Sequence, residues 1–233
     1  MREDDMTTLA ELRAVPGVPE STLDDASAAT LPADAPAAPW ECDSVGVVWW
    51  GRAAGVAASS ARDVLPGSGR PIVVVGGLIS YQRTPVGPYR EVFGGVGVRR
   101  GRGVELTIPF MAVDSRDSVV GGRQNWSLPK VLAEFGGEPG ADVLLSASGT
   151  GWAVQVTARP VGLRMPAPMT GRVAQRRPDG SVRTAVLRGR GRARPAIVTV
   201  SVESSGDLAT WLRPGRHLGL ITSDVTFTLP APG

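Results

Sequence analysis

Residues 142–159 read DVLLSASGTGWAVQVTAR, and this stretch decides the fold class of the chain. From Trp152 to Ala158 an apolar residue occupies every second position. Side chains on a β-strand point alternately to opposite faces, so this period of two predicts an antiparallel strand with one buried face. The Gly-Thr-Gly sequence at 149–151 predicts a turn that joins this strand to a preceding one over residues 142–148.

The same alternation recurs in three other places, at residues 104–108, 198–202 and 225–229. Arg-Pro-Asp-Gly at 177–180 predicts a further turn, because proline presets one backbone dihedral and glycine accepts a positive φ. It should join strands near 172–176 and 182–188. Helical signals are few and fall at Ala53–Val64, Ser115–Gly121 and Asp207–Leu212. We therefore expect a mainly β protein, most simply a single sandwich or barrel-like domain with a few short helices.

Length and composition exclude several classes of protein. The 233 residues can bury a proper core, and no apolar run approaches the roughly 18 residues of a membrane-spanning helix. The acidic start MREDDMTTLAELR has no apolar leader segment, so we expect a cytoplasmic protein with no membrane partner. One cysteine and one histidine exclude an internal disulfide framework and make a zinc site or a histidine-based triad improbable.

The two ends of the chain differ in charge. Residues 1–45 contain ten acidic side chains against two basic ones, and residues 1–40 are rich in alanine and proline. We expect residues 1–40 to form an acidic, mostly disordered or loosely draped tail, followed by one domain over 41–233. The densest basic stretch, 172–194, has no interleaved aromatic residues, so we favour a solvated hairpin over nucleic-acid binding. Binding of an acidic partner, including the tail itself, is the alternative for this stretch.

The chain contains 24 arginines and a single lysine, Lys130. A lysine amine can lose its proton, attack a carbonyl and form an imine, whereas a guanidinium stays charged. The neighbours of Lys130 in sequence are largely apolar, from Trp126 to Leu132. If they desolvate the amine, its pKa should fall and the nucleophilic form should become accessible near neutral pH. The alternative is an ordinary solvated lysine that persists by chance in an arginine-rich composition.

Two patches resemble the acetoacetate decarboxylase superfamily. Residues 122–133 read GRQNWSLPKVLA and resemble the Gly-Arg-Glu…Pro-Lys-Lys-Leu signature of that family. Residues 81–91, which read YQRTPVGPYRE, resemble its Gly-x-Tyr-x-Glu segment. The likeness extends loosely from about Trp40 to Pro230, and it implies an antiparallel, cone-like or barrel-like sheet. It also implies a homo-oligomer.

The resemblance implies a role for several residues. Lys130 matches the lysine that forms the Schiff base, and Glu91 matches an acidic residue that handles protons beside it. The candidates for substrate binding are Arg123, Gln124, Tyr89 and Trp126. The alternatives are an exposed carboxylate at Glu91, a clamp on backbone carbonyls at Arg123, simple packing at Trp126, and a contact at Tyr89 that only holds its loop in place. The implied substrate is a keto acid or ketone, and the chemistry needs neither a metal nor an organic cofactor.

The chain also departs from the family pattern. Val131 stands where the family has its second lysine, and Gln124 stands where the signature has glutamate. The family's second active-site glutamate falls at Gly76, and its arginine before the first core strand has no counterpart around Trp40–Ser44. We therefore expect a Schiff-base-forming lyase whose reaction is decarboxylation or of the aldol or dehydration type. The alternative is a non-catalytic protein that binds a small hydrophobic ligand on the same fold.

Overall fold

A computed structural model describes residues 8–54, 69–101 and 103–233. Eleven strands lie in these ranges: β1 (Trp40–Arg52), β2 (Arg70–Arg83), β3 (Tyr89–Arg100), β4 (Gly103–Val113), β5 (Lys130–Leu132), β6 (Glu134–Gly136), β7 (Leu144–Gly149), β8 (Trp152–Pro160), β9 (Met165–Arg176), β10 (Val182–Ser204) and β11 (Gly215–Leu229). The helices are α1 (Leu9–Arg13), α2 (Asp25–Ala28), α4 (Arg116–Trp126) and α5 (Leu208–Leu212), with a 3₁₀ turn η2 at Pro19–Ser21. The prediction of a mainly β protein with a few short helices is therefore confirmed.

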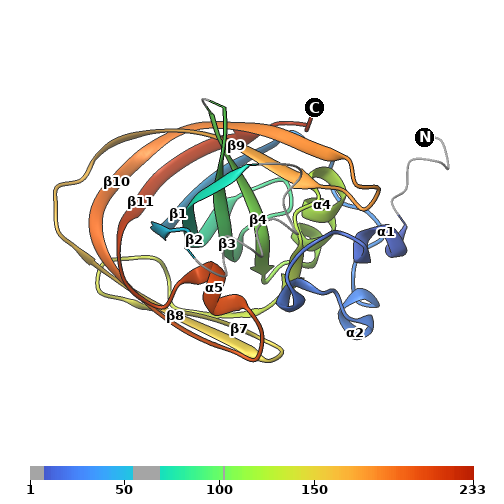
Figure 1. The fold of residues 1–233 in the computed structure, drawn as a ribbon, viewed down its shortest axis with the longest axis horizontal. Helices are drawn as coiled ribbons and strands as arrows, with labels where there is room; N and C mark the ends of the chain where they lie inside the picture. The colour runs from blue at the N-terminus through green and yellow to red at the C-terminus, as the bar shows by residue number, and fades with distance from the viewer. Residues whose placement is uncertain (1–7, 55–68, 102) are drawn as a thin grey trace.

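All eleven strands form one sheet, and part of it closes into a ring (Figure 1). The order within the ring is β11-β1-β2-β3-β4-β9-β10, and pairing of β10 with β11 completes it. β10 is long enough to pair with β9 through its first half and with β8 through its second half. Most pairs are antiparallel, as predicted, but β5 runs parallel to β4 and β4 meets β9 in one parallel bridge. The ring surrounds the space in which the candidate site lies.

The predicted turns and most predicted helices lie where the sequence placed them. The turn at 177–180 joins β9 to β10, with Arg176 opposite Val182, and the turn at 149–151 joins β7 to β8. Two predicted helical segments correspond to α4 and α5. The third, Ala53–Val64, lies almost wholly outside the described residues. Within the described part of the chain, no helix has both the length and the apolar character needed to span a membrane.

Two large hydrophobic clusters and one smaller one lie in the described residues. In the first, α5 contributes Leu208, Trp211 and Leu212, which are fully buried against the sheet. Trp49 from β1 packs in the same cluster and donates its indole N–H to the carbonyl of Leu212 at 2.8 Å. The second cluster contains Trp40 from β1 with side chains of β4, β10 and β11, and it borders the site. Helix α5 thus packs against one part of the sheet, and the candidate cavity lies among side chains of the second cluster.

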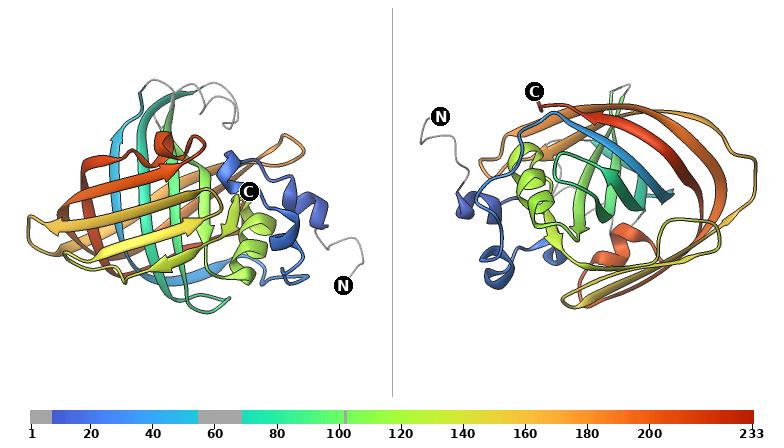
Figure 2. Two further views of the ribbon diagram at one scale, coloured as in Figure 1. Left: turned by 90° about the horizontal axis from the view of Figure 1, so that it is seen from below. Right: turned by 180° about the vertical axis from the view of Figure 1, so that it is seen from behind.

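Residues 8–39 differ from the mostly disordered tail that their composition predicts. Figure 2 shows this segment, with α1 and α2, lying beside α4 in both views. Its scattered apolar residues provide the reason, because Leu12, Val15 and Val18 are buried. The backbone N–H of Val18 also donates to the carbonyl of Pro109 in β4 at 2.9 Å. Few apolar side chains are enough here, because the domain offers them a surface to pack on.

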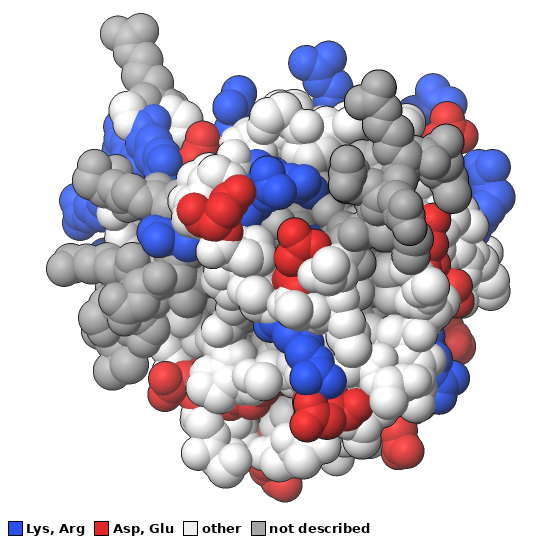
Figure 3. All heavy atoms as spheres, turned by 90° about the vertical axis from the view of Figure 1, so that its right-hand side faces the viewer, with Lys and Arg blue, Asp and Glu red and all other residues white. Residues whose placement is uncertain are grey.

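The basic stretch 172–194 is distributed between surface and interior. The side chains of Arg188, Arg190 and Arg192 are exposed at alternate positions of β10. Arg183, on the same strand, is partly buried and turns towards the site. On the face drawn in Figure 3, acidic and basic side chains are interspersed.

Candidate active site

The chain reverses direction at the end of α4, and this reversal positions Lys130. Ser127 adopts a left-handed conformation (φ 55°) that ends the helix, and Leu128 N–H donates back to the Gly122 carbonyl at 3.0 Å. Residue 130 then begins β5, opposite Met111 of β4. A Cβ atom at Gly122 would lie 2.5 Å from Cδ of Lys130, so the lysine side chain crosses α4 where the helix has no side chain. Gly122, the glycine of the Gly-Arg motif, therefore has a packing role, because its lack of a side chain leaves room for the side chain of Lys130.

The Lys130 amine is buried among polar partners. Its Nζ lies 2.9 Å from Oε2 of Glu91, and it donates to Oγ of Ser118 at 2.9 Å and to the hydroxyl oxygen of Tyr89 at 3.2 Å. Only 3% of Lys130 and 3% of Glu91 are exposed to solvent. Tyr89 and Glu91 occupy alternate positions of β3, so both side chains point to the same face of the sheet. The other carboxylate oxygen of Glu91 accepts a hydrogen bond from the Tyr81 hydroxyl at 3.1 Å.

The electrostatics of this cluster differ from the expectation for an isolated buried lysine. Burial by itself lowers the pKa of Lys130, but the carboxylate of Glu91 and the oxygen of Tyr89 together raise the pKa above its ordinary value. The prediction that desolvation would lower the pKa was therefore wrong about the resting site. Burial in turn raises the pKa of Tyr89 to about 12, so its hydroxyl stays protonated. At rest the site holds an ammonium–carboxylate pair inside an apolar region.

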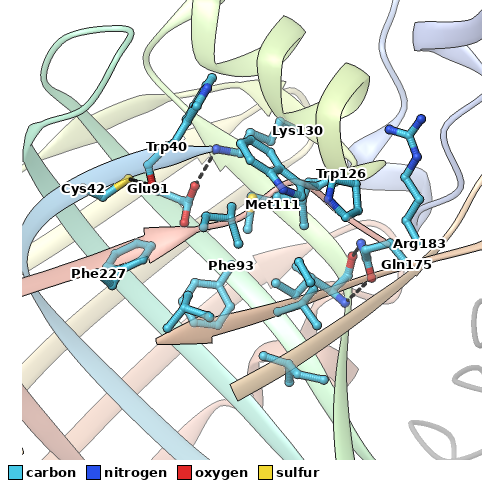
Figure 4. Close-up of a pocket in the computed structure, with 18 of the residues that line it drawn as sticks. Trp40, Cys42, Glu91, Phe93, Met111, Trp126, Lys130, Gln175, Arg183 and Phe227 are labelled. Carbon is cyan, nitrogen blue, oxygen red and sulfur yellow. Dashed lines mark hydrogen bonds and ion pairs between the residues drawn. The ribbon is translucent and has the colours of Figure 1, made fainter. Parts of the chain in front are cut away.

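A cavity of about 160 Å³ opens beside this ion pair. Its walls come from β1, β2, β3, β4, β9, β10 and β11 together with the end of α4 and the C-terminal segment. Figure 4 shows the rings of Phe93 and Phe227 below the pair of Lys130 and Glu91, with α4 above it. The lining is mainly aromatic and aliphatic. The amine therefore lies beside a mainly apolar space with room for a small organic molecule.

The six predicted site residues divide into two groups. Lys130, Glu91, Tyr89 and Trp126 all line the cavity. Arg123 and Gln124 belong to the same helix but are not among the described residues that line it.

Arg123 is a buried clamp on three backbone carbonyls. Its Nε donates to the Lys130 carbonyl at 2.6 Å, and its two terminal nitrogens donate to the carbonyls of Leu12 and Ser21 at 2.7 and 2.8 Å. Burial lowers the pKa of Arg123 to about 10. The geometry corresponds to the clamp that was the alternative interpretation of this residue. Arg123 therefore joins the backbone of the lysine to the N-terminal segment.

Sequence reasoning missed several residues of the site. Ser118 lies three residues into α4 and touches the amine, and no motif marked it. Tyr81 stacks on Tyr89 with ring centroids 4.5 Å apart, although only its place in the quoted 81–91 segment singled it out. Cys42 also lines the cavity, and burial raises the pKa of its thiol to about 12. Across the described residues, no group of three or more histidine, cysteine, aspartate or glutamate side chains could hold a metal ion.

Two of the positions at which we expect the sequence to depart from the family pattern, 131 and 76, have packing roles. Val131 is buried in the first hydrophobic cluster, next to Lys130 in sequence but in a different environment. Gly76 lies under Trp49, where a Cβ atom would come within 2.3 Å of the indole ring. A side chain at position 76 would therefore require that tryptophan to move.

Comparison with known proteins supports the resemblance seen in the sequence. The family described as acetoacetate decarboxylase matches residues 56–167. The solved acetoacetate decarboxylase of Legionella pneumophila subsp. pneumophila str. Philadelphia 1 is 13% identical with a TM-score of 0.57, over 100% of this chain and 97% of that chain. No curated protein sequence matches the chain.

Two other solved structures share the fold. The enduracididine biosynthesis enzyme MppR, complexed with pyruvate, is 13% identical with a TM-score of 0.59, over 85% of this chain and 90% of that chain. An acetoacetate decarboxylase-like enzyme from Sphingomonas wittichii RW1 is 13% identical with a TM-score of 0.54, over 84% of this chain and 92% of that chain. At these identities the structural matches establish a common fold.

Proposed function

This chain belongs to the acetoacetate decarboxylase superfamily, and from that membership and the geometry around Lys130 we propose that it is a Schiff-base-forming lyase. Its substrate would be a keto acid or ketone, and its nucleophile would be the amine of Lys130. The observation that carries the proposal is the position of Nζ, which is buried beside a cavity and 2.9 Å from the carboxylate of Glu91.

The first step must remove a proton from the resting ammonium. Glu91 Oε2 lies at hydrogen-bond distance and is the acceptor we assign to this proton. The neutral amine then attacks the carbonyl carbon, and one proton passes from its nitrogen to the carbonyl oxygen, which becomes the hydroxyl of a carbinolamine. The proton held by Glu91 returns to that hydroxyl, which leaves as water and gives a protonated imine. The net change is the loss of one water. The nitrogen is cationic and Glu91 is anionic both before the first of these steps and after the last.

The protonated imine then accepts electrons from the substrate. In a β-keto acid, the bond to the carboxylate breaks, CO₂ leaves, and the electron pair passes through the enamine carbon to the nitrogen. Protonation of that carbon and addition of water release the ketone and restore the lysine. In the aldol alternative the protonated imine loses a proton from its α-carbon, and the resulting enamine attacks an aldehyde. Loss of water from the adduct and hydrolysis of the imine then give the dehydrated product and restore the lysine. MppR has been solved in complex with the condensation product of pyruvate and imidazole 4-carboxaldehyde, so the fold accommodates such a product in that enzyme.

The remaining site residues would position these groups. Tyr89 keeps its proton and accepts a hydrogen bond from Nζ, so it would hold the amine towards the cavity. Ser118 would do the same from α4. Trp126 lines the cavity, while its indole N–H donates to the carbonyl of Pro230 at 2.7 Å, so we assign it to the wall. Arg123 would act as a positioning residue through the Lys130 carbonyl.

The single lysine makes the proposal directly testable. Incubation with a panel of keto acids and ketones, followed by borohydride reduction, should add the mass of the substrate to the peptide that contains Lys130. The N-terminal amine is the only other primary amine and is resolved by the same peptide map. The Lys130→Met variant is the control and should give no adduct in that peptide. Absence of an adduct with every carbonyl compound at every pH would overturn the proposal.

A second function has one observation in its favour. The raised pKa of Lys130 keeps the amine charged at rest, as expected if it serves only to neutralise Glu91 beside an apolar ligand site. A non-catalytic protein of this kind would bind small apolar molecules reversibly and give no adduct on reduction. Equilibrium dialysis of an apolar ketone, run beside the reduction experiment, separates the two functions. The homo-oligomer expected from the family is tested by light scattering on the purified protein.

A further inference from the structure

We infer that the substrate carries an apolar group of about six carbons on its carbonyl, and that this group fills the cavity beside Lys130. The inference rests on the proposed function and adds a class of substrate to it. It depends on three features of the cavity, which are the distribution of its polar groups, the bonding of those groups, and its size.

The polar groups of the cavity gather at one place. Lys130, Glu91, Tyr81 and Tyr89 form a single hydrogen-bonded cluster. Away from this cluster most of the wall is made of apolar side chains from six strands, β1, β3, β4, β9, β10 and β11. They include Phe93, Leu106, Ile108, Val173, Leu187 and Phe227. A carbonyl placed at the amine would therefore extend its substituent against apolar surface (Figure 4).

The two other polar side chains in the lining, Gln175 and Arg183, hydrogen-bond to backbone groups. The Gln175 amide accepts from Ile108 N–H at 2.9 Å and donates to the Ile108 carbonyl at 2.9 Å. Arg183 directs one terminal nitrogen to the carbonyls of Gln124 and Asn125, both at 2.6 Å. Away from Arg183, a charged or strongly polar group on the substrate would be desolvated along this wall without a matched partner, which is costly. An apolar group there meets no such cost.

The size of the cavity sets the size of the group. An apolar cavity of roughly 150 Å³ in another protein holds one benzene molecule. The cavity here measures about 160 Å³, so it accommodates a phenyl ring or an alkyl chain of about six carbons. Acetone-sized substrates would leave much of this apolar surface without contacts. Larger groups exceed the volume of this cavity.

The test measures binding along a series of straight-chain methyl ketones. The concentration that gives half-maximal borohydride trapping at Lys130 should fall about fourfold for each added methylene, up to a chain of about six carbons, and then stop falling. A half-maximal concentration that is flat or rises along the series would overturn the inference. Calorimetric titration of the same ketones into the wild-type protein provides an independent measurement that needs no covalent step.

The two measurements distinguish failure of the inference from failure of the proposed function. If no ketone is trapped but the calorimetric affinity rises with chain length, the proposed chemistry is wrong and the apolar specificity stands. If ketones are trapped equally at all lengths, the chemistry stands and the specificity is wrong. Failure of both trapping and binding overturns both.

A variant of the cavity wall tests the location of the apolar group. Ala185 of β10 is buried and lines the cavity, whereas the neighbouring Val186 is not among its lining residues. Ala185→Phe should fill the space and move the best chain length to shorter ketones, while Val186→Phe should leave the series unchanged. Ala185→Leu is the smaller change to use if the larger one prevents folding. An unchanged preference in a folded Ala185 variant would contradict the assignment of this cavity to the substrate tail.

Discussion

Replacing Glu91 by glutamine should convert the buried Lys130 amine from a charged group into a neutral one. In the native site, the Glu91 carboxylate lies 2.9 Å from Nζ and is the anion that holds the proton. Glutamine keeps nearly the same shape and can still accept from the Tyr81 hydroxyl, which donates to the carboxylate at 3.1 Å in the native site. The partners that remain around the amine, Tyr89 and Ser118, are uncharged hydroxyls. Burial would then lower the pKa of Lys130, with no neighbouring negative charge to raise it.

The size of the effect follows from proton linkage. The native pKa of Lys130 lies above its ordinary value, so the stability contributed by its protonation is fully present below about pH 10.4 and does not vary near neutral pH. Lysines buried without a partner have pKa values of about 5 to 6. In the variant, the unfolded chain then binds a proton that the folded chain does not, so stability must rise with pH. The slope is about 1.4 kcal/mol per pH unit, or about 2.7 kcal/mol between roughly pH 6.5 and 8.5.

Urea denaturation of both proteins at several pH values measures this slope. The relevant quantity is the difference in the free energy of unfolding between Glu91→Gln and wild type, because ionisation of other groups cancels in the difference. Glu105→Gln is the matched control, since Glu105 pairs at 3.3 Å with Arg100, whose guanidinium keeps its proton. Its difference from wild type should show no slope in this range. A flat difference for Glu91→Gln would mean that Lys130 stays charged without the carboxylate, and the electrostatic account of the site would be wrong.

Three further predictions test the supporting structure. Gly122→Ala places a Cβ atom 2.5 Å from Cδ of Lys130, so it should reduce borohydride trapping at least tenfold, whereas Gly171→Ala, with no atom within 4 Å of its Cβ, should leave trapping unchanged in the same assay. Arg123→Lys loses part of a three-carbonyl clamp and should lower the free energy of unfolding by about 3 kcal/mol while exposing the N-terminal segment to limited proteolysis; equal protease resistance would contradict the clamp. The thiol of Cys42 keeps its proton to about pH 12 when folded, so stability should fall as pH rises above about 8.5, where the unfolded thiol ionises, and Cys42→Ser should remove that fall in urea denaturation.

The strands could be predicted because their signal is local. A strand with one buried face must alternate apolar and polar residues, and this alternation is readable at 152–158 without knowledge of any partner. Closure of the ring is not local. It depends on β10 pairing with both β9 and β11, and Arg188 opposite Thr228 is one contact of that closure between segments far apart in sequence. Nothing in either segment alone specifies the other.

The residues of the site divide in the same way, into those that the sequence identifies and those that only the fold brings together. Lys130 was identifiable because it is the only lysine in the sequence, and the family resemblance then assigned Glu91 and Tyr89 to the same site. Ser118 was missed because a serine near the start of a helix is ordinarily a surface or capping residue, and only the reversal at Ser127 brings the lysine back along α4. The segment over residues 8–39 was misjudged for a related reason. Its composition is that of a disordered tail, but its few apolar residues find a surface to pack on in the folded domain.

The direction of the Lys130 pKa shift could not be predicted from the sequence. It also bears on how a charged resting amine is compatible with the proposed chemistry. Burial and pairing shift a lysine pKa in opposite directions, so the outcome depends on the 2.9 Å separation from Glu91, which no sequence pattern gives. A protonated imine would place its positive charge at the same nitrogen. The carboxylate that makes the free amine harder to deprotonate would therefore also stabilise that intermediate, without reorganisation of the site. In the proposed reaction, the ion pair slows the first attack but lowers the energy of the electron-accepting intermediate on which every later step depends.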